Sequence, residues 1–336
     1  MHVILVSPFS SGPIRGNIIT VNRIARHLQL LGIQTTTLPL DRYAQKETIS
    51  QLAASPPDLL HAFHAFHSGP LARSLSQQLQ IPYLVTITGS DLFDPAFRDH
   101  PATILALQDA HAITCFDSII AERLAATYPG LSGKTVVIPQ GVDPLPDSKP
   151  LSRPPDSFIV LLPAALRPVK GVLEAIDALT PLIERIPNLQ LWLAGGELDS
   201  DYAGQIRQRA ATLNWIRLLG ELPHDRMGAV YRAADLVLNA SLFEGGMANC
   251  LLEAMTCARP VLARDIAGNR SLVRHGETGW LYRDEHDLRD MISLLAEQPG
   301  QREEVGRAAA LFVSDCFSAA NEAAALLSLY CRITQV

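Results

Sequence analysis

The chain has 336 residues, of which 48% are hydrophobic, and it carries a formal net charge of −6. A chain of this length and apolar content can bury substantial cores, and it predicts two domains rather than one. The acidic balance and the scattered Lys and Arg residues argue against a surface that binds nucleic acid.

The apolar runs of the sequence are all shorter than a bilayer span, and Met1 and His2 lead directly into a strand pattern. We therefore expect neither a transmembrane segment nor a signal peptide. The five cysteines are an odd number without metal-ligand spacing, which indicates reduced thiols in a cytoplasmic protein.

The first half of the chain alternates β-rich and helical patterns. The predicted strands lie within residues 2–8, 34–40, 59–67, 83–93, 112–116 and 135–143. Apolar side chains recur on one helical face at 18–28, and 118–128 is also helical in pattern. Strands that recur between helices predict a doubly wound α/β domain with a parallel sheet, whose ligands bind beyond the carboxyl ends of the strands.

The second half repeats this alternation after a linker rich in proline and polar residues at 144–156. Its predicted strands lie within residues 158–166, 189–195, 216–222, 236–241, 260–264 and 279–282. The helical patterns lie at 173–186, 202–213 and 224–233, and 287–330 is mostly helical. We therefore predict domains at residues 1–148 and 149–318, followed by a helical tail at 319–336.

The stretch from Asn239 to Pro260 reads as a strand, a glycine turn and a helix. The first N–H groups of a helix have no partner within it, so they attract anions or hydroxyl-rich ligands. Glu244 in the turn and Glu253 in the helix would suit the hydroxyls of a nucleotide sugar. The spacing also fits a first-turn carboxylate at Glu244 and a solvated residue at Glu253, and it does not decide between these interpretations.

The segment LFEGGMANCLLEAM resembles the signature of the family 4 glycosyltransferases, which are retaining enzymes of the GT-B architecture. The resemblance implies two Rossmann-like doubly wound domains that face each other across a cleft. It also implies that Glu244 holds sugar hydroxyls and that Glu253 holds the nucleotide ribose. The residues implied to meet the sugar and diphosphate are Gly246, Met247, Ala248 and Asn249. The spacer between the glutamates is one residue longer than usual, so counting back from Glu253 would place Gly245 at the sugar position.

Arg167 and Lys170 follow the first strand of the second domain and precede a helix. An Arg and a Lys at this point can neutralise a diphosphate, although solvated cations are common in loops. Family members keep this pair to hold the donor diphosphate, and the resemblance extends that role to both residues. The loop at 220–227 matches the family segment whose backbone reads the base, which assigns Leu222 to the donor site, although an ordinary connection fits equally well.

The loop from Gly12 to Asn17 resembles the family's glycine loop near the donor phosphate and the acceptor. We therefore assign Gly16 to the donor and Asn17 to the acceptor side. Arg15 is either a further phosphate contact or a solvated residue, since this loop is not a dinucleotide fingerprint.

The histidines His61, His64 and His67 would form a metal-binding face only if their segment were helical. The segment instead predicts a strand followed by a loop, with His64 facing the acceptor and no metal bound. Asp199 and Asp201 predict a solvated loop rather than a magnesium site.

In the loop after the fourth strand, Thr88 stands where many family members have a histidine, and Asp91 follows it. A threonine hydroxyl cannot accept a proton near neutral pH, so acceptor activation would proceed without that residue or use Asp91. We place Thr88 and Asp91 on the acceptor side. The same threonine, the loop RGN and the EGG turn give a partial resemblance to the selenosugar synthases.

These observations predict a metal-independent retaining hexosyltransferase with Arg167, Lys170 and Glu244 as catalytic residues. Its co-substrate is a nucleoside-diphosphate sugar, with UDP-sugar favoured over GDP- or ADP-sugar, and its acceptor is a small molecule or a glycan. No other cofactor is expected. The alternatives are a nucleotide-sugar-binding protein with a disabled site and a selenosugar-synthase-like transferase. The sequence does not identify the sugar, the base, the acceptor or the oligomeric state.

The resemblance also assigns the domains their roles. The N-terminal domain would hold the acceptor, the C-terminal domain would hold the donor, and the tail from residue 319 would pack back on the N-terminal domain.

Overall fold

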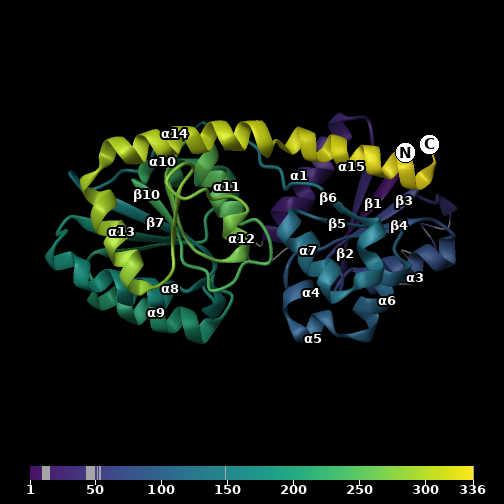
Figure 1. The fold of residues 1–336 in the computed structure, drawn as a ribbon, viewed down its shortest axis with the longest axis horizontal. Helices are drawn as coiled ribbons and strands as arrows, with labels where there is room; N and C mark the ends of the chain where they lie inside the picture. The colour runs from purple at the N-terminus through teal and green to yellow at the C-terminus, as the bar shows by residue number, and fades with distance from the viewer. Residues whose placement is uncertain (10–15, 43–49, 51, 53, 148, 336) are drawn as a thin grey trace. The chain divides into compact units, whose positions relative to one another are not determined.

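The computed structural model describes residues 1–9, 16–42, 50, 52, 54–147 and 149–335. The chain divides into two compact units (Figure 1). The first unit comprises Met1–Gly141 and Phe317–Val336, and the second comprises Val142–Cys316. Each unit has its own six-stranded sheet with flanking helices. The prediction of two doubly wound α/β domains is therefore confirmed.

The sheet of the first unit has the strand order β2-β1-β3-β4-β5-β6, and all its neighbouring strands are parallel. Its strands are β1 (His2–Ser7), β2 (Gln34–Pro39), β3 (Leu59–Phe63), β4 (Tyr83–Thr86), β5 (Ala112–Cys115) and β6 (Thr135–Val137). Continuous apolar runs such as that of β1 are typical of parallel strands, which are covered on both faces. In β1, the side chains from Val3 to Val6 are buried.

The helices of this unit are α1 (Gly16–Leu30), α3 (Gly69–Leu79), α4 (Ser90–Phe93), α5 (Pro95–Arg98), α6 (Pro101–Asp109), α7 (Ser118–Thr127) and α15 (Ala319–Thr334), with 3₁₀ turns η1 (Leu40–Arg42) and η2 (Pro129–Lys134). Strand β4 is shorter than the predicted run at 83–93, because the chain leaves the sheet after Thr86 and forms α4 from Ser90. The side chain of Asp117 caps α7 by accepting the backbone N–H of Ile120 at 2.8 Å.

Helix α15 belongs to the first unit, although it follows the second unit in the sequence. Its apolar face packs with α1 and with β1 and β3 in one buried cluster. Beside this cluster, Arg23 Nε donates to Glu322 Oε2 at 3.0 Å, and the two side chains are only 5% and 2% exposed. Removing one partner of such a buried pair leaves an uncompensated charge, so the pair fixes how α15 docks on α1.

The sheet of the second unit has the order β12-β11-β10-β7-β8-β9, again with all neighbouring strands parallel. Its strands are β7 (Phe158–Pro163), β8 (Leu189–Ala194), β9 (Ile216–Gly220), β10 (Leu236–Asn239), β11 (Val261–Arg264) and β12 (Trp280–Tyr282). Its helices are α8 (Val172–Leu179), α9 (Ser200–Thr212), α10 (Met227–Ala233), α11 (Asn249–Thr256), α12 (Ala267–Arg270), α13 (Glu285–Glu297) and α14 (Pro299–Cys316), with 3₁₀ turns η3 (Pro168–Lys170), η4 (Thr180–Glu184) and η5 (His224–Arg226).

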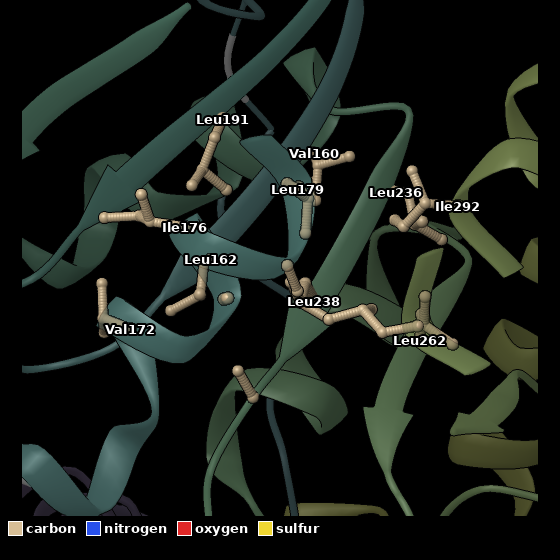
Figure 2. Close-up of a cluster of buried hydrophobic side chains, with 14 of the residues drawn as sticks. Val160, Leu162, Val172, Ile176, Leu179, Leu191, Leu236, Leu238, Leu262 and Ile292 are labelled. Carbon is tan, nitrogen blue, oxygen red and sulfur yellow. The ribbon is translucent and has the colours of Figure 1, made fainter. Parts of the chain in front are cut away.

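A large cluster of buried hydrophobic side chains lies in the second unit (Figure 2). Leucine and valine side chains from β7, β8, β10 and β11 meet Val172, Ile176 and Leu179 of α8 there, and Ile292 of α13 lies at the same core. This packing fixes β7 and β10 as neighbours and so fixes where the loops after both strands begin. In the part of the chain that the structure describes, no helix has the length and apolarity that a bilayer crossing requires.

Candidate functional site

The loops after β7 and β10 leave the same edge of the second sheet, because the two strands are adjacent and parallel. After β7 the chain forms η3, and after β10 it passes through residues 240–248 into α11. The backbone N–H of Leu242 donates to the carbonyl oxygen of Val169 at 2.9 Å. This bond ties the two loops together at the carboxyl edge, where parallel α/β sheets bind ligands.

A half-buried ion pair joins the two loops through their side chains. Lys170 Nζ lies 2.5 Å from Glu244 Oε1, and the same oxygen accepts hydrogen bonds from Ser241 Oγ at 2.6 Å and from Asn239 Nδ2 at 3.3 Å. Burial by itself raises the pKa of Glu244, but the charge of Lys170 and the hydrogen bonds outweigh it and lower the pKa below its ordinary value. The carboxylate is therefore ionised at neutral pH.

The side-chain amides of Asn239, at the end of β10, and Asn269, in α12, form a hydrogen-bond network behind Glu244. The side-chain oxygen of Asn239 accepts from the backbone N–H of Ser241 at 3.1 Å and from Asn269 Nδ2 at 3.3 Å. The Asn269 amide also donates to the backbone oxygen of Arg264 at 2.9 Å. Asn239 is thereby held in one orientation, with its own Nδ2 directed at Glu244.

Two glycines allow neighbouring segments to approach the loop after β10: Gly171 follows η3, and Gly268 lies in α12. A Cβ at Gly268 would lie 2.5 Å from the carbonyl oxygen of Gly246 and 2.8 Å from Glu244 Cβ. Gly171, directly after Lys170 in sequence, has a φ of 61°, and a Cβ there would lie 2.2 Å from the carbonyl oxygen of Ala240. Both positions therefore require glycine for the observed path of the backbone.

Glu253 on α11 takes part in a second network. Its Oε1 lies 2.8 Å from His224 Nε2, and its Oε2 accepts from the Tyr231 hydroxyl at 2.9 Å. Glu253 is only 6% exposed, which rules out the alternative of a solvated face residue. Burial, followed by the charge of Glu253, raises the pKa of Tyr231 well above its ordinary value, so the phenol keeps the proton that it donates.

Cys250 lies where both acidic groups act on it. Its Sγ accepts from Asn239 Nδ2 at 3.6 Å. Burial, with further contributions from the charges of Glu244 and Glu253, raises the pKa of Cys250 to about 12. The group is therefore a neutral thiol, and it does not act as a nucleophile near neutral pH.

In the first unit, Asp91 links the loops after β3 and β4. Its carboxylate is fully buried and accepts the backbone N–H groups of Ala65 at 2.7 Å, Gly89 at 2.7 Å and Thr88 at 3.1 Å. The protein backbone thus engages both oxygens of this carboxylate. Thr88 is half-buried beside it.

The histidine segment is a strand followed by a turn, as predicted, because β3 ends at Phe63. His61 lies within the sheet, where Nδ1 is 2.7 Å from the Tyr330 hydroxyl and Nε2 is 2.6 Å from Thr86 Oγ1. Burial lowers the pKa of His61 to about 3, so it is neutral and joins α15 to the sheet. His64 lies beyond the strand end, with Nε2 3.0 Å from Ser90 Oγ.

Comparison with known proteins places both units in one family. The glycosyl transferases group 1 family matches residues 157–298, and Glycosyltransferase Family 4 matches residues 1–144. The chain belongs to the family 4 glycosyltransferases. This membership confirms the resemblance that the sequence motifs predicted.

Two of three curated relatives of this chain are glycosyltransferases by name. It is 25% identical over 310 residues to glycosyltransferase 1 domain-containing protein 1 of Xenopus tropicalis, covering 84% of this chain and 85% of that protein. It is 30% identical over 195 residues to the trehalose synthase of Thermococcus litoralis, covering 52% and 47%. It is 31% identical over 163 residues to the D-inositol 3-phosphate glycosyltransferase of Pseudarthrobacter chlorophenolicus, covering 47% and 39%. The matches thus span less than half the length of the last two relatives.

Solved structures share the fold of this glycosyltransferase at low sequence identity. Sucrose-phosphate synthase of Thermosynechococcus elongatus has a TM-score of 0.82 and 20% identity over 99% of each chain. The Anabaena protein HepE in complex with UDP-glucose has a TM-score of 0.77 and 21% identity, covering 98% of this chain and 99% of that one. These similarities confirm the predicted GT-B fold.

The other predicted site residues of the glycosyltransferase fall at loop and helix ends. Arg167 is exposed at the start of η3, and Leu222 is half-buried between β9 and η5. The turn residues Gly246, Met247 and Ala248 are buried, and Asn249 begins α11. Gly16 and Asn17 begin α1, and Arg15 lies outside the described residues.

Sequence reasoning missed the partners of the two glutamates. Asn239 and Ser241 lie directly at the end of a predicted strand, a position that could have indicated their role. His224 lies in the loop at 220–227, for which the family resemblance implies only a backbone role. Tyr231 reads as an ordinary core residue of a helix, and no sequence signal marks it.

Among the residues that the structure describes, no three His, Cys, Asp or Glu side chains are grouped so that they could hold a metal ion. The carboxylate of Asp199 accepts the backbone N–H of Tyr202 at 2.9 Å and caps α9.

Proposed function

We propose that this glycosyltransferase moves a hexose from a nucleoside-diphosphate sugar to an acceptor, with retention of anomeric configuration and without a metal ion. The ion pair of Lys170 and Glu244 carries this proposal, since it places a cation and an ionised carboxylate together at the carboxyl edge of one sheet. HepE has been solved with UDP and with UDP-glucose, which supports a UDP-sugar as the donor here.

Four charged residues of the second unit each suit one part of such a donor. Lys170 and Arg167 would bind the diphosphate, Arg167 with a bidentate fork and Lys170 as a point charge. Glu244, ionised and held by Ser241, would accept hydrogen bonds from sugar hydroxyls. Glu253, held by Tyr231, would accept those of the ribose.

The reaction step needs no nucleophile from the protein. The bond between the anomeric carbon and the diphosphate oxygen breaks, and its electron pair stays on the diphosphate. The acceptor bonds to the same face of the anomeric carbon, and its proton passes to the departing diphosphate oxygen. Lys170, Arg167 and the amides of residues 246–249 would stabilise the negative charge that develops on the leaving group.

The two units would divide this work. The second unit would bind the donor, and the loops after β3 and β4 of the first unit would present the acceptor. Helix α15 would keep the first unit intact through the Arg23–Glu322 pair. A selenosugar-synthase-like reaction is a variant of the same proposal that differs in the acceptor.

A direct test incubates the purified protein with UDP-, GDP- and ADP-sugars and measures release of the nucleoside diphosphate by chromatography, with and without EDTA. Release from a UDP-sugar is expected to survive EDTA and to fall at least about 100-fold in Lys170→Ala and Glu253→Ala. Lys149→Ala and Glu277→Ala change exposed residues of the same types and are expected to keep wild-type rates.

The alternative outcomes separate the competing functions. Binding of a nucleotide sugar without release would support a binding protein with a disabled site. Loss of activity in EDTA, recovered with magnesium, would contradict the metal-independent reaction. Inversion at the anomeric carbon, read by NMR of the product, would contradict the proposed displacement.

A further inference from the structure

Six aromatic rings gather in the first unit outside the residues discussed for the donor. This aromatic cluster consists of Phe9, His64, Phe66, His67, Phe97 and His100. Phe66 and Phe97 are stacked, with ring centroids 4.6 Å apart and an interplanar angle of 27°. Phe66, His67 and Phe97 are half-buried and His100 is exposed, so the cluster is not part of the hydrophobic core.

The cluster lies at the edge of the sheet where ligands of this fold bind. Phe9 follows β1, residues 64–67 follow β3, and α5 with Phe97 comes after β4 and α4. Because β1, β3 and β4 are adjacent and parallel, all these segments leave the carboxyl edge of the first sheet. The aromatic cluster is thus the counterpart, in the first unit, of the charged loops in the second.

Backbone strain marks the centre of the cluster. His64 has a φ of 80°, a left-handed conformation that is costly for a residue with a side chain and that is concentrated at functional sites. Its ring lies 4.3 Å from His67, centroid to centroid, and 5.7 Å from Phe97. The strained residue therefore holds the rings of two loops together.

The hydrogen bonds of His64 determine which ring nitrogen carries the proton. Nδ1 accepts the backbone N–H of His67 at 3.2 Å, so the proton of the neutral ring is on Nε2 and is donated to Ser90 Oγ at 3.0 Å. Ser90 is exposed, and its oxygen is already an acceptor, so its hydroxyl hydrogen is available to donate. His64 acts here as a positioning residue for Ser90 rather than as a base.

In the described segments 64–69 and 87–100, the charges of the Lys, Arg, Asp and Glu side chains disfavour an anionic ligand. Within residues 64–69 and 87–100 the only Lys or Arg is Arg98, and Asp99 binds its guanidinium through two hydrogen bonds of 2.7 Å. The same segments carry the carboxylates of Asp91, Asp94 and Asp99. A phosphorylated or carboxylated acceptor would find no unengaged cation in these segments and would meet net negative charge.

We propose that the aromatic cluster and Ser90 form the acceptor subsite, and that it takes an uncharged acceptor with an apolar ring face and a hydroxyl group. The ring face packs against the outer side of the stacked Phe66–Phe97 pair, and the acceptor oxygen receives the Ser90 hydrogen. This inference rests on the proposed transfer reaction, because it names the class of molecule that receives the sugar. The ring face is that of a sugar or of an aryl group.

The test measures binding of ring probes to the intact protein by saturation-transfer NMR, without any donor. Phenyl β-glucoside is expected to bind, and glucose 6-phosphate is expected not to bind. Binding of methyl β-glucoside would indicate that the subsite takes a sugar face, and binding of phenol would indicate that it takes an aryl face. Phe97→Leu keeps the apolar bulk but removes the ring. It is expected to weaken the binding of phenyl β-glucoside about three- to tenfold. Ser90→Ala, at an exposed position, is expected to weaken the binding of phenyl β-glucoside about two- to tenfold.

Two matched variants control for general effects. Phe312→Leu removes a half-buried ring from the second unit, and Ser132→Ala removes an exposed hydroxyl elsewhere in the first unit. Both are expected to bind phenyl β-glucoside as the wild type does. Equal weakening by a variant and its control, tighter binding of glucose 6-phosphate, or no binding of any ring probe would overturn the proposed subsite.

These outcomes are independent of the donor assay. If the nucleotide sugar is never cleaved but the ring probes bind in a Phe97-dependent way, the transfer reaction fails and the ring-binding site stands. If the sugar is transferred but the probes fail to bind, the subsite fails and the transfer reaction stands.

Discussion

Among the groups that keep the Glu244 carboxylate ionised, Lys170 has the largest effect, ahead of the hydrogen bonds from Ser241 and Asn239. Lys170 and Glu244 are 17% and 13% exposed, so water screens them only in part. Without Lys170, burial becomes the dominant influence on the pKa of Glu244 and raises it. The variant Lys170→Met is therefore expected to lose about 1–3 kcal/mol in the free energy of unfolding at pH 7, because a buried carboxylate loses its partner.

The pH dependence of this loss has a definite sign. In the wild type the folded pKa of Glu244 is below the ordinary 4.5, so its stabilising contribution is present above pH 4.5 and is lost as the pH falls through the folded value. In Lys170→Met the folded pKa is raised, so the variant regains stability as the pH falls through that value. Urea unfolding from pH 7 to pH 4 should show the two proteins converging. A gap that does not change with pH, or an equal loss in Lys149→Met, would refute this account.

His61 provides a second prediction at the residue scale. Its ordinary pKa is 6.5 and its folded pKa is about 3, so the unfolded chain binds a proton between these values and the folded chain does not. Protonation of His61 in the unfolded chain therefore has no effect on the free energy of unfolding well above pH 6.5. It lowers that free energy as the pH falls, by on the order of 2 kcal/mol at pH 5. His61→Gln is expected to remove this acid-dependent loss, although it lowers the stability at pH 7.

The measurement is the free energy of unfolding at pH 7 and at pH 5 for the wild type and His61→Gln. His286→Gln is the control, because the side chain of His286 is 78% exposed. The wild type and the control should become less stable at pH 5 by a similar amount, and His61→Gln by distinctly less. An unchanged acid response in His61→Gln would mean that this histidine is not the titrating group.

At the scale of elements, the approach of the loop after β11 to the Glu244 turn depends on Gly268. A methyl group at Gly268 would collide with the carbonyl oxygen of Gly246 and with Glu244 Cβ. Gly268→Ala must therefore shift the turn and displace Glu244 from Lys170 and Ser241. We expect at least about a tenfold loss in the rate of sugar transfer, corresponding to about 1.4 kcal/mol or more in the transition state.

Steady-state release of nucleoside diphosphate measures this effect, and thermal unfolding shows how much of it is destabilisation. Gly133→Ala is the matched control, because a Cβ at Gly133 has no neighbour within 4 Å. Equal rates in Gly268→Ala and Gly133→Ala would show that the position of the turn does not matter for transfer.

The sheets could be predicted from the sequence because parallel strands have a strong local signal. Apolar runs such as residues 158–163 are buried on both faces and need no knowledge of their partners. The ends of strands have a weaker local signal, as β4 shows by ending at Thr86. The run at 83–93 continues past Thr86 in β-prone residues, but Asp91 gathers three backbone N–H groups and turns the chain into α4.

The contacts of the site could be predicted only in part. The segment at 242–255 indicates Glu244 and Glu253, and the segment at 165–171 indicates Lys170. However, the pairing of Lys170 with Glu244 joins residues 74 positions apart, and that of Tyr231 with Glu253 joins residues 22 apart. Such contacts depend on which strands become neighbours, and the local pattern does not contain this information. The roles of Arg167, Asn17 and Thr88 toward a ligand stay predictions.

At the scale of the whole molecule, the two units differ in how the chain forms them. The second unit is one continuous segment, whereas the first is completed by α15 from the far end of the sequence. The first unit therefore needs its last helix, which supplies Tyr330 to His61 and Glu322 to Arg23. The second unit contains a complete sheet and core without any residue from the first.

Because the second unit is one continuous segment, we predict that residues 142–316 fold when they are expressed alone. All the residues proposed to bind the donor, except Gly16, lie in this segment. The isolated segment should therefore bind UDP with a dissociation constant within about tenfold of that of the whole chain, and it should transfer no sugar. Calorimetric titration and thermal unfolding check this, with Glu253→Ala in both the segment and the whole chain as the control. A folded segment that does not bind UDP, while the whole chain does, would show that the first unit contributes directly to holding the donor.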